Sequence, residues 1–177
     1  MRKEGLVMKE VSVNELMLNP MDKIAHQWML ITAGCGERGY NTMTASWGHL
    51  GSLWGHGGGK PTAVIFVRPQ RYTKTFLDRE GLFTLSFFSR EYHSALGYLG
   101  SHSGRDGDKV AAAGLTPLFG EDYTAFEEAE LTLVCRKLYH APILEEGFVD
   151  RAVMEESYPN RDFHEMYIGE ILHVFVK

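Results

Sequence analysis

The chain has 177 residues, of which 44% are hydrophobic and 23% charged, and its formal net charge is −5. This length and composition predict one domain that spans residues 1–177 and buries a sizeable core without a metal or a disulfide. The acidic balance argues against a nucleic-acid partner, because proteins that bind nucleic acids present a basic face.

Short strands with a few helices between them are predicted in the first two thirds of the chain. β-Branched and aromatic runs bounded by glycine and proline indicate the strands, and unbroken runs of good helix formers indicate the helices. In chain order, the predicted elements are strands at 28–33 and 40–47, a glycine-rich loop at 50–60, a strand at 63–67, a helix at 72–79, a strand at 82–88, and helices at 91–99 and 108–113. The first two strands are expected to form a hairpin.

Two long strands are predicted in the last third, with a loop at 145–162 between them. The first begins at Ala129, where apolar and polar residues alternate. The second covers 163–176 and has two apolar faces: Met166, Ile168, Leu172, Val174 and Val176 on one, and Phe163, Tyr167, Ile171 and Phe175 on the other. We expect burial on both sides of this strand, either within a barrel or at a subunit interface, and a bulge or tight bend at Gly169.

The irregular order of these elements predicts the fold class. Regular alternation of strands and helices would indicate a doubly wound parallel sheet, and it is absent from the sequence. We therefore expect a mainly β or α+β fold, a β-barrel with a few short flanking helices.

Residues 34–39 match the dinucleotide-binding pattern G-x-G-x-x-G and follow a predicted strand. In a dinucleotide site this pattern opens a helix, whose N-terminus binds the pyrophosphate. Here the next residues have no helical apolar stripe, and no acidic residue follows at the distance where a ribose partner would lie. We therefore expect a hairpin turn.

Three polar segments carry residues suited to binding a phosphate and a ring. The strand at 41–47 offers small donors and acceptors, the turn at 68–73 has two arginines before a helix, and the loop at 101–109 combines hydroxyls, glycines and cations. Arginine and helix N-termini bind phosphate oxygens well. Each segment alone is also compatible with a polar edge strand, a solvated basic loop or a flexible surface loop.

Together and in this order, the segments resemble the flavin reductase-like family, whose members adopt the FMN-binding split barrel, and its flavoredoxin-like branch most closely. The resemblance covers 27–174 and includes His164 and the sequence Tyr167-Ile168-Gly169-Glu170. It implies a homodimer with FMN near the subunit interface. The residues expected to bind FMN are Asn41, Thr42, Met43, Thr44, Ala45, Ser46 and Trp47 for the ring and ribityl chain, and Arg68, Arg71, Tyr72, Thr73, Ser101, Ser103, Gly104, Arg105 and Lys109 for the phosphate.

The resemblance implies an oxidoreductase, and the leading hypothesis is an NAD(P)H-dependent flavin reductase that passes hydride from a reduced nicotinamide to flavin. His164 is the candidate catalytic residue, because an imidazole can hold the nicotinamide or supply a proton. A structural histidine is the alternative. A second hypothesis is a flavoredoxin-like electron carrier that takes electrons from a redox partner protein, and a third is a barrel that binds no flavin.

Several features bear on cofactors, metals and compartment. The glycine-rich sequence at 57–60 departs from a normal nicotinamide pocket, and the acidic residues at 145–162 disfavour the 2′-phosphate of NADPH and so favour NADH. The histidines, Cys35 and Cys135 have no metal-binding or redox spacing, so we expect no metal and two reduced thiols. With no signal-peptide pattern and no apolar run of membrane-spanning length, we expect a cytoplasmic protein without a membrane partner.

Overall fold

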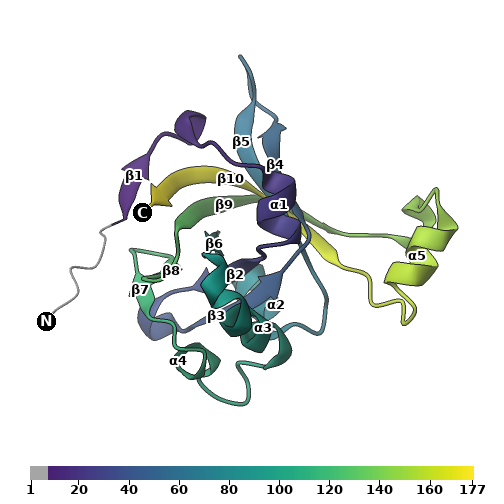
Figure 1. The fold of residues 1–177 in the computed structure, drawn as a ribbon. Coiled ribbons are helices and arrows are strands. Elements are labelled where there is room, and N and C mark those ends of the chain that lie inside the picture. Colours follow the sequence, from purple (N-terminus) through teal and green to yellow (C-terminus); the bar gives the residue numbers. More distant parts are fainter. Residues whose placement is uncertain (1–7) are drawn as a thin grey trace, which may run out of the picture.

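The computed structural model describes residues 8–177, which build one antiparallel sheet of eight strands curled around a core (Figure 1). The order along the sheet is β3–β2–β6–β9–β10–β5–β4, and β1 pairs with β10; a separate small sheet contains β7 and β8. The strands are β1 (Lys9–Val11), β2 (Met29–Gly34), β3 (Tyr40–Ala45), β4 (Gly48–Leu53), β5 (Lys60–Val67), β6 (Leu82–Phe87), β7 (Pro117–Phe119), β8 (Thr124–Phe126), β9 (Leu131–Pro142) and β10 (Glu165–Val176).

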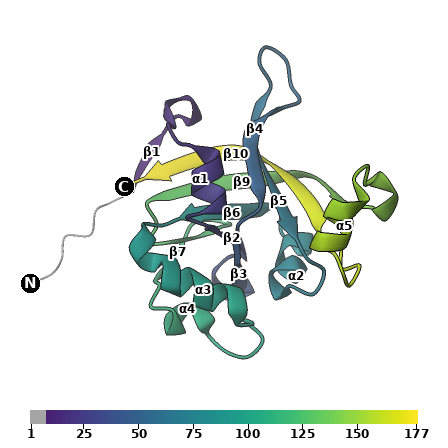
Figure 2. The ribbon, with the colours of Figure 1, turned by 45° about the vertical axis from the view of Figure 1, so that its right-hand side comes forward.

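Five short α-helices flank this sheet. They are α1 (Pro20–Ala25), α2 (Tyr72–Arg79), α3 (His93–Ser101), α4 (Lys109–Ala112) and α5 (Arg151–Ser157). Side chains of Asn19, Asp108 and Asp150 accept hydrogen bonds from the first turns of α1, α4 and α5, which explains where these helices begin. Figure 2 shows α3 and α4 lying together, with α5 standing apart from them. Within residues 8–177, every helix is too short or too polar to cross a lipid bilayer.

The sheet remains split between β3 and β4. These strands follow one another in the chain but stand at opposite ends of the strand order, so Ser46 and Trp47 must cross from one edge to the other. Among the described strands, β3 pairs only with β2. One edge of β3 therefore keeps main-chain donors and acceptors without a strand partner.

The predicted first half is confirmed in outline. β2 and β3 form the expected hairpin, and α2 has the predicted bounds. The predicted loop at 50–60 is wrong for its first residues, because β4 extends to Leu53 and pairs with β5 along its length. Its two glycines and a serine have low strand propensity, and pairing with β5 overrides that propensity. Only 54–59 form the connecting turn.

β10 departs from the simple alternation predicted for its two faces. The irregularity expected at Gly169 is confirmed, since the register shifts between Ile168 and Gly169, where Leu138 of β9 is the extra residue; a second shift makes Leu172 the extra residue of β10. The extra residue at Leu172 changes which residues of β10 face inward after it. Tyr167, Ile171 and Val174 consequently all join the barrel core, whereas Leu172 is 42% exposed. Within one chain the C-terminal part of the strand is therefore not buried on both faces, and burial at a subunit interface stays a prediction.

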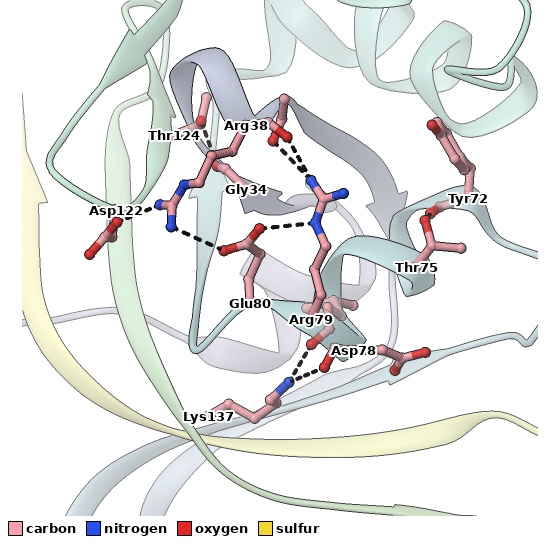
Figure 3. Close-up of polar contacts among 12 residues, drawn as sticks. Gly34, Arg38, Tyr72, Thr75, Asp78, Arg79, Glu80, Asp122, Thr124 and Lys137 are labelled. Atoms are coloured by element: carbon pink, nitrogen blue, oxygen red, sulfur yellow. Dashed lines mark hydrogen bonds and ion pairs between the residues drawn. The ribbon is translucent and has the colours of Figure 1, made fainter.

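The turn at 34–39 is a hairpin turn, as predicted. It contains a 3-10 turn at Gly36–Arg38 between β2 and β3. Figure 3 shows how polar contacts fix it: Arg38 pairs with Asp122 and Glu80, and Arg79 donates to the carbonyl of Arg38 at 2.8 Å. Its backbone is thus occupied by structural contacts rather than exposed at a helix N-terminus.

The segment at 145–162 is not the loop that the sequence suggested. It contains a 3-10 turn at Glu145–Gly147 and helix α5. The Asp150 cap starts the helix, and Arg161 pairs with Glu145 across it at 3.1 Å. The ion pair joins residues far apart in the segment, which local composition does not reveal.

Two hydrophobic clusters hold the fold together. The larger fills the barrel and includes Ile31, Ile65, Phe83, Leu133 and Tyr167. The smaller packs α3 and α4 against the sheet through Leu30, Phe88, Leu96, Leu99, Val110 and Phe126. Helices α2 and α3 are in this way fixed against β3, at the open edge of the sheet.

Candidate functional site

Three cavities adjoin one another beside β3. We call them the basic cavity, of about 390 Å³, the middle cavity, of about 250 Å³, and the apolar cavity, of about 610 Å³. The basic and middle cavities share Met43, Arg68 and Arg71, and the middle and apolar cavities share Ser46, Trp47 and Phe66. The three cavities therefore lie in a row, which we call the trough, with a charged end and an uncharged end.

The basic cavity brings together residues from all three predicted segments. Its lining residues are Asn41, Met43, Arg68, Gln70, Arg71, Tyr72, Thr73, Ser101, His102, Ser103, Gly104, Arg105 and Lys109. The side chain of the N-cap residue, Arg71, makes no hydrogen bond to the first turn of α2, which begins at this cavity. Cations, hydroxyls and a helix N-terminus around one space form an environment suited to an anion.

Two cations of this cavity are anchored to the end of α3. Arg71 donates to the carbonyl of Gly100 at 2.7 Å, and the Lys109 ammonium donates to the carbonyls of Leu99 and His102, both at 2.9 Å. Lys109 is buried, and its pKa is lowered to about 8, mainly by burial and further by the positive charge of Arg71. An anion between the two cations would stabilise the charged form of Lys109, because an opposite charge nearby favours the protonated ammonium.

Asn41, Thr73 and Gly104 pack closely at the floor of the basic cavity. The amide of Asn41 donates to the Thr73 hydroxyl oxygen at 2.7 Å, which leaves the hydroxyl proton of Thr73 free to donate. A Cβ on Gly104 would come within 2.1 Å of Asn41 Oδ1. Position 104 therefore requires glycine for the loop to approach β3 this closely.

The outer wall of the basic cavity is less firmly held. The Arg105 guanidinium lies over the Tyr72 ring, 4.4 Å from its centroid, and is exposed. The Ser101 hydroxyl donates to the carbonyls of its own helix, and Ser103 accepts from the amide of Arg105. Arg105 is consequently the cation at this end with the greatest freedom to meet a ligand.

The middle cavity is less charged. It is lined by Met43, Thr44, Ala45, Ser46, Trp47, Phe66, Arg68, Arg71 and His164. The residues from 43 to 47 present the open edge of β3 to it, with main-chain groups that could receive a polar ring edge. Trp47 is 45% exposed, so one side of the cavity is open.

Thr42 and Thr44 have different positions although the sequence grouped them. Thr42 is fully buried, with its hydroxyl 2.8 Å from that of Thr32 and 3.2 Å from the carbonyl of Ile31, and it lines none of the three cavities. Both side chains lie on the face of β3 opposite Asn41 and Met43, and Thr42 is buried there beside Thr32, its partner on β2. Thr44 lines the middle cavity, and its hydroxyl donates to the carbonyl of Leu96 at 2.5 Å.

His164 is buried between two aromatic residues at the middle cavity. Its Nδ1 lies 2.8 Å from the hydroxyl oxygen of Tyr158, and its ring centroid is 5.0 Å from that of Trp47. Burial, together with the charge of Arg68, lowers the pKa of His164 to about 4. The imidazole is therefore neutral at pH 7 and offers hydrogen bonds rather than a stored proton.

Arg68 does not lie free at the basic cavity. Its guanidinium pairs with Asp162 and donates to the carbonyl of Ser157 at 3.0 Å. The hydrogen bond from Arg68, followed by that from Gln70, holds the pKa of Asp162 below its usual value. Arg68 thus connects β5 to the segment that carries α5, and Arg71 and Arg105 are better placed to meet an anion.

A family model described as "Flavin reductase like domain" matches residues 21–177. The chain belongs to this family. No curated protein sequence matches it.

Solved structures show the fold of this flavin reductase-like chain. An FMN-binding domain of a flavin reductases-like enzyme from Shewanella baltica has 14% identity and a TM-score of 0.65 over 96% of this chain and 77% of that one. Flavoredoxin from Desulfovibrio vulgaris has 23% identity and a TM-score of 0.64 over 96% and 77%. An NADH:FAD oxidoreductase from Streptomyces globisporus has 17% identity and a TM-score of 0.59 over 85% and 74%. These likenesses identify the fold as a flavin reductase-like split barrel.

Sequence reasoning missed several residues that line the trough of this flavin reductase-like domain. Gln70 and His102 lie in the basic cavity, Phe66 in the middle and apolar cavities, and Tyr158 in the apolar cavity. Gln70 and His102 lie within segments already singled out, so their position was a usable signal. Phe66 and Tyr158 looked like ordinary core aromatics.

The glycine-rich turn lies away from the three cavities. The turn at 54–59 joins β4 to β5 and lines none of the three cavities. Among the side chains described by the structure, no group of three or more His, Cys, Asp or Glu is placed to hold a metal ion.

Proposed function

We propose that this chain binds FMN in the trough, with the phosphate in the basic cavity and the isoalloxazine ring in the middle cavity. The observation that supports this most directly is the charge distribution: Arg71, Arg105 and Lys109 line the basic cavity, and His164 in the middle cavity is neutral at pH 7. A phosphate monoester carries about −1.5 to −2 charge at neutral pH, which suits the cations of one end only.

The residues present fit this cofactor. The Thr73 hydroxyl and the N-terminus of α2 would donate to phosphate oxygens, beside the cations. The close approach of Gly104 to Asn41 leaves the loop backbone near the ligand. The free edge of β3 would meet the polar edge of the ring. Thr42, which is buried away from the trough, would act by supporting β3.

We further propose that the chain is an oxidoreductase of the flavin reductase type. When bound, FMN would accept a hydride from a reduced nicotinamide and pass the electrons to an acceptor. The chain's own residues would orient the ring between Trp47 and the β3 edge, and Tyr158 would fix the imidazole of His164 by their 2.8 Å hydrogen bond. His164 would then hold the nicotinamide by a hydrogen bond. A homodimer would cover the exposed side of Trp47, and the cytoplasm remains the proposed compartment.

The preference for NADH over NADPH is part of this proposal. Glu155 and Glu156 of α5 are exposed, and α5 also contributes Val153 to the wall of the apolar cavity. Two carboxylates near the entrance would repel a 2′-phosphate. Comparing kcat/KM for the two nucleotides tests this preference, and equal values would contradict it.

An electron carrier with bound FMN and no NAD(P)H turnover is the second candidate function. It is favoured by the absence of any Lys or Arg among the described residues lining the apolar cavity, where the pyrophosphate of a dinucleotide would need a cation. Steady NADH oxidation with free flavin as acceptor separates the two functions. Turnover supports the reductase, whereas FMN retention without turnover supports the carrier.

The FMN site is tested by titrating FMN into flavin-free protein. Arg71→Gln and Arg105→Gln should each weaken FMN binding about tenfold or more, because each removes a charge-assisted hydrogen bond. Arg90→Gln is the matched control, since Arg90 is an exposed arginine outside the trough. If all three variants bind FMN as the wild type does, the phosphate does not occupy the basic cavity.

A further inference from the structure

The apolar cavity is large, and its wall carries no lysine, arginine, aspartate or glutamate among the residues described. Its volume of about 610 Å³ lies in the range typical of small-molecule sites. The lining residues are Pro20, Met21, Ile24, Ala25, Ser46, Trp47, Gly48, His49, Leu50, Phe66, Ile143, Phe148, Val153, Ser157 and Tyr158. Among these described residues there is no Lys, Arg, Asp or Glu.

The wall has few polar side chains, namely those of Ser46, Trp47, His49, Ser157 and Tyr158. The Tyr158 hydroxyl is hydrogen-bonded to His164, and the carbonyl of Ser157 accepts from Arg68. Aromatic side chains, in contrast, stand on several sides: Trp47, Phe66, Phe148 and Tyr158. A ligand bound here would make extensive apolar contacts, and a charged group on that ligand would find no opposite charge among these residues to offset its desolvation.

The apolar cavity shares part of its wall with the middle cavity. Both contain Ser46, Trp47 and Phe66, so a molecule in the apolar cavity would lie against whatever ring occupies the middle cavity. Four separate parts of the fold form its wall: α1, β4, the end of β5, and the segment around α5. Arg68 and Asp162 tie that last segment to β5, which keeps the wall in place.

We propose that the apolar cavity binds a small, uncharged aromatic molecule that contacts the ring held in the middle cavity. The proposal rests on the proposed FMN site only for the identity of that ring. The uncharged wall selects against carboxylates, sulfonates and phosphates, and the aromatic side chains select for flat ligands. This assigns a ligand class to a part of the molecule separate from the basic cavity.

The test compares two probes with the same ring system. 2-Naphthol is uncharged at neutral pH, and 2-naphthalenesulfonate differs from it by carrying an anionic group. Equilibrium dialysis against the protein as purified should show that naphthalenesulfonate binds at least about tenfold more weakly, since burying an unpaired charge in an apolar wall is costly. Equal affinities, or no binding of either probe, would overturn the proposal.

A pair of valine variants locates the binding. Val153 lines the cavity and is half exposed, whereas Val149 in the same segment is fully exposed and lies outside the wall. Val153→Glu should weaken 2-naphthol binding about tenfold, because it places a carboxylate beside the ligand. Val149→Glu should leave binding unchanged. If the two variants bind 2-naphthol equally well, the probe binds elsewhere and the proposal is wrong.

The flavin spectrum separates this proposal from the proposed function. In an FMN-loaded protein, bound 2-naphthol should perturb the visible absorption of the flavin, and Val153→Glu should reduce that perturbation. An unperturbed flavin despite binding would contradict contact with the ring. A colourless protein that still binds 2-naphthol with the Val153 dependence would support the cavity and contradict the FMN site.

Discussion

Replacing Lys109 by methionine tests whether a buried cation helps to hold the phosphate. Its pKa is about 8 in the ligand-free protein, against an ordinary value of 10.5. This difference corresponds to roughly 3 kcal/mol that disfavours the ammonium form in the folded chain. A phosphate beside Lys109 and Arg71 would offset this cost. Lys109→Met should therefore weaken FMN binding about 10- to 100-fold, the loss expected for one hydrogen bond to a charged group of about 1.5–3 kcal/mol.

The assay is a fluorescence titration of FMN into flavin-free protein between pH 7 and 9.5. Wild-type affinity should fall as the pH rises above about 8, because free Lys109 then loses its proton and binding must restore it. The variant should lack this dependence. Between about pH 8 and 10.5 the unfolded chain binds more protons at this residue, so the stability of the flavin-free wild type should rise over that range. FMN affinity within twofold of wild type in Lys109→Met would refute the reasoning.

Three further predictions concern packing and protonation. Gly104→Ala should weaken FMN binding about tenfold, because its methyl group displaces Asn41, whereas Gly97→Ala, which meets no atom within 4 Å, should not. Gly169→Ala should lower the free energy of unfolding by about 1–3 kcal/mol in urea titrations, since its Cβ would approach a buried phenylalanine ring to 2.6 Å. The His164 ring should titrate near pH 4 by NMR, and its burial should reduce stability as the pH falls from 6.5 toward 4, because only the unfolded chain gains that proton. A midpoint near 6.5 would show that the imidazole is solvated.

The parts of the fold that local sequence specifies were predictable. The β2–β3 hairpin and α2 follow from runs of suitable residues between glycines or prolines, and the structure has both. β4 was missed because its residues have low strand propensity and acquire their conformation by pairing with β5. The inward-facing residues of β10 were partly misassigned, because a bulge changes the alternation without changing composition.

The candidate site was predictable as segments and not as contacts. Polar and glycine-rich stretches identified most of the residues around the basic and middle cavities. The burial of Thr42 beside Thr32 and the pairing of Arg68 with Asp162 depend on strand register and on chain segments far apart in sequence. The apolar cavity had no sequence signal, because its wall uses apolar residues from four parts of the chain that resemble ordinary core.

The visible absorption spectrum of the purified protein, recorded without oxygen before and after adding NADH, tests the central claim most directly. We predict flavin bands that bleach on addition of NADH, which requires both a bound flavin and a reaction with the nicotinamide. Bands that bleach only with dithionite would contradict the reductase and leave the electron carrier. A colourless protein that stays colourless when FMN is added and removed by gel filtration would contradict the flavin site itself.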